Sequence, residues 1–120
     1  MTDVVAYQGI AGANSELAVK QHFGDSVESH PCETFDELLA VLHRGDVRYA
    51  LLPVENSFAG AVHGAYELLM DYDFQIQAEI VYHVHHALLL PEDMTINDIT
   101  TVHSHPQALA QSSRFIRRHN

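Results

Sequence analysis

The stretch Val4-Val5-Ala6-Tyr7-Gln8-Gly9-Ile10-Ala11-Gly12 decides how the chain is expected to fold. It begins with an apolar run typical of a buried strand and ends in two glycines, which favour a turn. A helix is predicted next, capped by Asn14 or Ser15 and running to about Phe23. The two glycines match neither the dinucleotide fingerprint nor the P-loop, so we do not expect a nucleotide site.

The same alternation of strand and helix continues towards the carboxyl terminus. Residues 26–31 form a predicted second strand, and residues 49–53 form a third. Between them, Thr34 and Glu37 have the spacing of a capping box, and they open a helix that ends near Gly45. Strands that alternate with helices indicate an α/β fold with a parallel sheet and helices on both of its faces.

Composition and charge limit the partners that the chain can have. Its apolar fraction of 47% is ordinary for a globular domain, and its formal charge of −10 includes only six Lys and Arg. So acidic a chain is a poor partner for nucleic acid or an anionic membrane. No signal peptide or membrane-spanning run is evident, and the single cysteine, Cys32, is predicted to be a buried, reduced thiol. We therefore expect a cytoplasmic protein.

Polar side chains follow the third predicted strand. Glu55, Asn56 and Ser57 come directly after it, on a loop that Gly60 makes tight. Ligands of parallel sheets gather at the carboxyl ends of the strands, so this loop is a candidate binding site. Asn and Ser are also common turn formers, and a turn without a ligand is the alternative. An amphipathic helix is predicted over residues 62–70.

The remaining chain is predicted to leave the first sheet. Apolar and polar residues alternate from Phe74 to Ile80, and the pattern stays extended to Leu90. A helical turn is expected at residues 96–99 and a brief strand at 101–103. Residues 1–78 are therefore predicted to form a first lobe and residues 79–120 part of a second lobe. This second part is too short to cover its own sheet edges, so we expect further chain, a partner subunit or an exchanged segment to complete it. We also expect a homodimer or a higher homo-oligomer.

A second polar motif spans Ser104 to Gln111. Ser104 is the predicted N-cap, Pro106 fits the first turn, and Gln107 completes a capping box. Gln107 and Gln111 lie one turn apart, so their side chains leave the same face of the helix near its amide-rich end. Such an end attracts carboxylates and phosphates. The alternative is a well-capped surface helix with no ligand.

Ten histidines raise the question of a metal site. His83 and His85 would share one face of a strand, which is workable geometry for zinc. No spacing in the sequence matches a zinc signature, however, and the one cysteine is distant. We therefore expect no metal.

Three motifs together resemble the prephenate dehydratase family and the closely similar arogenate dehydratases. They are Ala6 through Glu16, Leu52 through Ser57 with Gly60, and Ser104 through Gln111. The resemblance extends from Val5 to Gln111 and implies a periplasmic-binding-protein-like fold, in which two lobes enclose the active site. Its parallel-rich second lobe would be incomplete in this chain.

The resemblance also implies a reaction and the residues that serve it. Prephenate loses carbon dioxide and hydroxide to give phenylpyruvate, a step of phenylalanine biosynthesis, and no metal or organic cofactor is implied. The substrate would be a small molecule, prephenate or arogenate. The implied catalytic residues are Asn56, Ser104 and Gln111. The implied substrate-binding residues are Glu55, Ser57, Gly60, His105 and Gln107.

The sequence departs from the family pattern in one respect. Members contain a further Thr-Arg-x-Phe motif thought to supply a hydroxyl and a carboxylate-binding Arg, and no Thr-Arg pair occurs in these 120 residues. The chain is therefore interpreted as the front part of a dehydratase, either active or inactive as it stands. The alternative is a non-catalytic cleft module that binds a small carboxylate through amides and helix ends.

Overall fold

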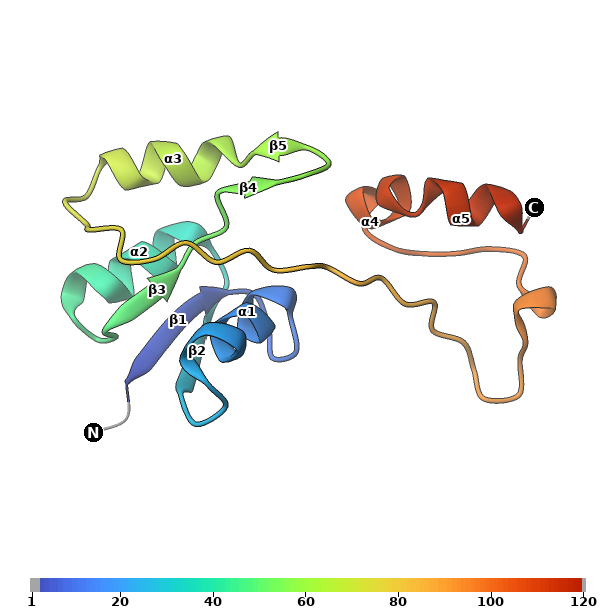
Figure 1. The fold of residues 1–120 in the computed structure, drawn as a ribbon, viewed down its shortest axis with the longest axis horizontal. Helices are drawn as coiled ribbons and strands as arrows, with labels where there is room; N and C mark the ends of the chain where they lie inside the picture. The colour runs from blue at the N-terminus through green and yellow to red at the C-terminus, as the bar shows by residue number, and fades with distance from the viewer. Residues whose placement is uncertain (1–2, 120) are drawn as a thin grey trace. The chain divides into compact units, whose positions relative to one another are not determined.

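The computed structural model describes residues 3–119, which divide into two compact units (Figure 1). The first unit extends to His83 and the second begins at Val84. Each unit is described by itself below. No helix among the described residues is long and apolar enough to cross a membrane.

A three-stranded parallel sheet forms the centre of the first unit. Its strands are β1 (Val4–Gln8), β2 (Glu28–Cys32) and β3 (Tyr49–Leu51), in the order β2-β1-β3. Ala6 lies opposite His30 on one side and Ala50 on the other. The three predicted strands and their parallel arrangement are confirmed.

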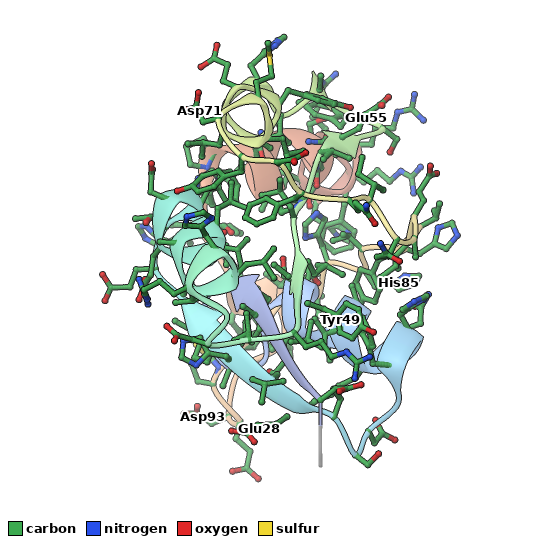
Figure 2. The ribbon with its side chains drawn as sticks, turned by 90° about the vertical axis from the view of Figure 1, so that its left-hand side faces the viewer. Glu28, Tyr49, Glu55, Asp71, His85 and Asp93 are labelled. Atoms are coloured by element: carbon green, nitrogen blue, oxygen red, sulfur yellow. The ribbon has the colours of Figure 1, made fainter. Side chains whose placement is uncertain are left out.

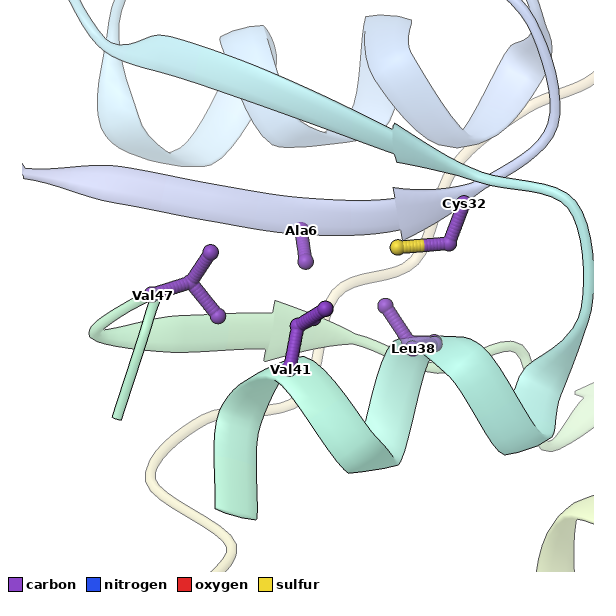
Figure 3. Close-up of a cluster of buried hydrophobic side chains, with 5 residues drawn as sticks. All are labelled: Ala6, Cys32, Leu38, Val41 and Val47. Carbon is purple, nitrogen blue, oxygen red and sulfur yellow. The ribbon is translucent and has the colours of Figure 1, made fainter. Parts of the chain in front are cut away.

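Helices cover both faces of this sheet. Successive side chains of β1 point to opposite faces, so apolar residues have to be buried on each of them. Val5 and Tyr7 are buried with Val19 of α1 (Asn14–Phe23). On the other face, α2 (Phe35–Arg44) packs over a second cluster. That cluster consists of Ala6, Cys32, Leu38, Val41 and Val47 (Figure 3).

The single cysteine belongs to this core. Cys32 is 1% exposed, which confirms the prediction of a buried thiol. Burial raises the pKa of the thiol, and the nearby Glu37 carboxylate raises it further. The thiol therefore stays protonated and poorly nucleophilic at neutral pH.

The two helices begin in different ways. At α2 the Thr34 hydroxyl accepts a hydrogen bond from the Glu37 amide at 3.1 Å, and the left-handed Gly45 closes the helix, as predicted. The predicted capping box is only half formed, because the Glu37 carboxylate accepts from the Glu33 amide, at 2.7 Å, in place of the Thr34 amide. At α1 the prediction is wrong, because the N-cap is Ala13 and Asn14 is already helical. No side chain caps the first turn, and the Glu16 carboxylate, which lies in that turn, accepts instead from the Gly12 amide before the helix.

Glu16 joins three parts of the first unit. Its carboxylate accepts hydrogen bonds from the Gly12 amide at 2.6 Å and from the Ser29 hydroxyl at 2.9 Å, and Lys20 lies 3.4 Å away. The Gly12 and Ser29 hydrogen bonds are the main causes that hold the pKa of Glu16 below its ordinary value, and Lys20 adds to them. The carboxylate therefore fastens the glycine-rich turn to β2 while it is ionised.

After β3 the chain makes a hairpin and a helix. The hairpin pairs β4 (Glu55–Asn56) with β5 (Gly60–Ala61) in antiparallel fashion. Helix α3 (His63–Met70) follows, close to the predicted range. Its Ala65 is buried, whereas Met70, the last residue of the helix, is 86% exposed.

Residues 74–90, predicted as a long strand, form no strand in the described structure. Residues 101–103 likewise form no strand. Alternating apolar side chains favour a strand, but a strand also needs a hydrogen-bonded neighbour, and these residues join neither described sheet. Both strand predictions are therefore wrong for the described residues.

The second unit is made of short helices and extended chain. A 3-10 turn, η1 (Ile96–Asp98), confirms the predicted helical turn, and Thr95 with Asp98 forms its capping box. Two helices follow, α4 (Pro106–Gln111) and α5 (Ser113–Arg118). None of residues 84–119 is buried, so this unit has no core among its own described residues.

The core of the first unit can be tested with Leu38→Ala. Leu38 is fully buried, so the truncation leaves a cavity and should lower the free energy of unfolding by about 2–5 kcal/mol. Leu17→Ala, at a position 42% exposed on α1, is the matched control and should have a much smaller effect. Urea denaturation followed by circular dichroism measures both, and equal losses would contradict the assigned core.

Glu16→Gln tests the carboxylate that fastens the turn. Because the folded state lowers the pKa of Glu16, the ionised group stabilises the protein above the ordinary value of 4.5, and this stability is lost as pH falls through the folded pKa. The variant should be less stable at neutral pH and should lose less stability on acidification. Urea denaturation from pH 7 to pH 3 measures both effects. Glu28→Gln, at an exposed position of β2, is the control, and a variant with the parent's acid dependence would refute this role.

Candidate functional site

The predicted site residues fall into two groups. The first group lies on the β4–β5 hairpin and consists of Glu55, Asn56, Ser57 and Gly60. The second group lies at helix α4 and consists of Ser104, His105, Gln107 and Gln111. The first group belongs to the first unit and the second group to the second unit.

Asn56 shapes the turn of the hairpin. Its side-chain oxygen accepts hydrogen bonds from the Phe58 amide at 3.1 Å and from the Ala59 amide at 2.6 Å. The predicted simple loop is therefore corrected to a hairpin whose turn this side chain closes. The amide nitrogen of Asn56 has no partner among the described hydrogen bonds. A fixed carboxamide whose NH₂ group is available can donate to a ligand.

The other predicted residues of this group lie on the same hairpin. Glu55 pairs with Ala61 and is exposed (Figure 2), and Ser57 is exposed in the turn. Gly60 has φ +76°, a conformation that favours glycine, and it pairs with Asn56. The hairpin thus carries a carboxylate, a carboxamide and a hydroxyl on three consecutive residues.

Helix α4 begins one residue later than predicted. Its N-cap is His105, whose Nδ1 accepts a hydrogen bond from the Gln107 amide at 3.2 Å. Ser104 is exposed and precedes the cap, so the predicted Ser104 capping box is wrong. Pro106 explains the shift, because proline favours the first helical position and therefore places the cap at the residue before it.

A contact that sequence reasoning missed holds the other end of α4. His86 Nε2 lies 2.6 Å from the side-chain oxygen of Gln111. His86 directly follows His85, one of the two histidines considered above as metal ligands. His86 and Gln111 are 25 residues apart, so no local sequence pattern predicts their contact, and only the fold brings the two side chains together.

Two open pockets lie at the carboxyl ends of β1 and β2. One, of about 590 Å³, is lined by Gln8 and by residues of α2 and α3, and the other, of about 630 Å³, includes Gly9 and Cys32. Neither contains a predicted site residue. The first pocket is lined by four carboxylates, which disfavour a dianion there. Those four belong to Glu33, Asp36, Glu67 and Asp71.

The described structure does not contain the strand on which His83 and His85 were expected to share a face as metal ligands. His83 and His85 do not lie on a described strand, so the expectation of a shared strand face is wrong. Within residues 3–119, no group of three His, Cys, Asp or Glu side chains is arranged to hold a metal ion.

Comparison with solved structures supports the α/β fold over part of the chain. The X-ray structure of prephenate dehydratase from Streptococcus mutans matches with a TM-score of 0.54 and 29% sequence identity. The match covers 57% of this chain and 36% of that one.

Sequence comparisons extend the likeness over nearly the whole chain. Arogenate dehydratase/prephenate dehydratase 2, chloroplastic, of Arabidopsis thaliana is 43% identical over 107 residues, which are 89% of this chain and 28% of that protein. The bifunctional chorismate mutase/prephenate dehydratase of Escherichia coli K12 is 34% identical over 119 residues, covering 96% of this chain and 31% of that protein. This chain thus spans about three-tenths of the length of the curated relatives it matches. The family model described as prephenate dehydratase matches residues 5–120, and the chain therefore belongs to the prephenate dehydratase family.

Proposed function

We propose that the chain contributes to the decarboxylating dehydration of prephenate to phenylpyruvate, as a hydro-lyase of phenylalanine biosynthesis. Family membership and relatives named as prephenate and arogenate dehydratases support this activity. The substrate would be prephenate or the chemically similar arogenate. We also propose that residues 1–78 and 79–120 belong to two lobes of a periplasmic-binding-protein-like domain that works as a homo-oligomer in the cytoplasm.

The orientation of Asn56 is the observation that carries this proposal. Its oxygen is occupied by the Phe58 and Ala59 amides, which leaves its NH₂ group as the donor available to a ligand. None of the six Lys and Arg lies in the two polar motifs, so within these motifs the donors proposed for the carboxylates of the substrate are neutral. A carboxamide held by two backbone hydrogen bonds meets this need without reorganising when the substrate binds.

The reaction requires the protein to orient the substrate more than to form covalent bonds with it. As carbon dioxide and hydroxide leave, the ring becomes aromatic, and this change supplies the driving force. The protein then needs to fix the carboxylates and to assist the departing hydroxyl. Asn56 and Gln111 are proposed for the first task. Glu55, Ser57, Gly60 and Gln107 are proposed to contact the substrate around them.

Departure of the hydroxyl needs a proton or a strong hydrogen-bond donor. Ser104 offers an exposed hydroxyl directly before the cap of α4. In the neutral His105 ring, Nδ1 accepts from the Gln107 amide, so the proton is on Nε2, which can donate. We propose Ser104 as the catalytic donor and His105 as a substrate-binding donor beside it.

The first experiment measures phenylpyruvate formation when the purified 120-residue chain is given prephenate. The proposal expects turnover, measured beside the Asn56→Asp variant described next. If the chain forms no phenylpyruvate but prephenate raises its melting temperature, it is a carboxylate-binding module instead. If neither turnover nor stabilisation is seen, these residues do not form a prephenate site by themselves, and the proposal fails for this chain.

Asn56→Asp tests the NH₂ donor of this side chain separately from the oxygen that closes the turn. Aspartate keeps an acceptor oxygen for the Phe58 and Ala59 amides, so the melting temperature should change little. It replaces the NH₂ donor with a negative oxygen that repels a carboxylate, and turnover should fall by about 10²-fold. Asn97→Asp adds the same charge at an exposed residue of η1 and should leave turnover unchanged. Equal rates in all three proteins would remove Asn56 from the site.

A further inference from the structure

The hydrogen bond between His86 and Gln111 stands apart from the others in the second unit. It joins an extended segment to the last residue of α4 across 25 positions of sequence, at 2.6 Å. The other side-chain hydrogen bonds described from Val84 onward join residues no more than three positions apart. This one contact therefore connects distant parts of the unit through polar side chains.

The chemistry of the two groups fixes which atom carries the proton. The side-chain oxygen of Gln111 is a carbonyl oxygen, which can only accept a hydrogen bond. His86 Nε2 must therefore donate, so its ring carries a proton at Nε2. With the oxygen occupied, the NH₂ group of Gln111 is the part of the carboxamide left to donate to another molecule.

We propose that His86 is a positioning residue that orients the Gln111 carboxamide so that its NH₂ group faces the substrate. This inference rests on the proposed function, in which Gln111 binds a substrate carboxylate or the departing hydroxyl. A carboxamide without such a partner can turn its oxygen towards the substrate, where it would repel a carboxylate. His86 acts through Gln111 and does not itself touch the substrate.

The exposure of both side chains argues against a purely packing role. His86 and Gln111 are exposed, and the unit has no buried residue for either to support. Truncating His86 should therefore change the direction of one carboxamide while leaving the helices in place. His85, which is exposed and adjacent in sequence, has no described side-chain hydrogen bond and provides a matched control.

Nuclear magnetic resonance of the 120-residue chain tests the contact without any activity. Long-range ¹H–¹⁵N spectra should show a proton on Nε2 of His86. In His86→Ala the side-chain NH₂ signals of Gln111 should move, whereas in His85→Ala they should stay in place. His86→Gln offers an NH₂ donor near the position of Nε2 and should return the Gln111 signals towards those of the parent. An unprotonated Nε2, or Gln111 signals unchanged in His86→Ala, would overturn the proposal.

A double-mutant cycle on prephenate turnover tests whether the orientation is used. His86→Ala should lower kcat/KM by about three- to tenfold, the size expected for one hydrogen bond, and His86→Gln should recover most of it. In a Gln111→Ala background, His86→Ala should have no further effect. An equal loss in both backgrounds would mean that His86 does not act through Gln111. Absence of turnover together with the expected resonance shifts would refute the proposed activity and leave the positioning contact standing.

Discussion

The two-sided burial of β1 is the constraint on which the first unit depends. Val5 and Tyr7 have to face α1 because Ala6, between them, faces α2, and all three are at most 1% exposed. A shift of one residue in the pairing with β2 or β3 would exchange both sets of side chains between the two cores. This alternation fixes the register of the parallel sheet. The register in turn fixes where β1 and β2 end, which is where the two pockets open.

Sequence reasoning predicted the features that depend on neighbouring residues. The Thr34 cap and the Gly45 end of α2 are local, and both were found where they were expected. The start of α1 was predicted wrongly because no side chain caps it, and the contact beside it, from Glu16 to Gly12 and to Ser29 of β2, depends on the fold. The strand predicted after Phe74 is absent from the described structure because alternation describes side chains, whereas a strand requires a hydrogen-bonded neighbour that sequence alone does not reveal.

Sequence motifs identify the candidate site residues, but they do not reveal the directions in which the side chains point. Asn56 and Gln111 were identified from motifs, yet the atoms that each leaves available depend on partners outside those patterns. In both side chains the carbonyl oxygen is occupied and the NH₂ group remains. A chain with few cations can in this way present donors to an acidic ligand, by using its own backbone and a histidine to orient neutral amides.

The central place of β1 also affects the order in which the chain can fold. Strand β1 pairs with β2, whose residues come about two dozen positions later, and with β3, which ends only at Leu51. The apolar side chains of β1 therefore stay uncovered until the residues up to Leu51 have been made. Sheet formation waits for contacts between distant residues, which slows folding compared with a helical bundle of equal size. During that interval the unpaired, apolar β1 is exposed to aggregation.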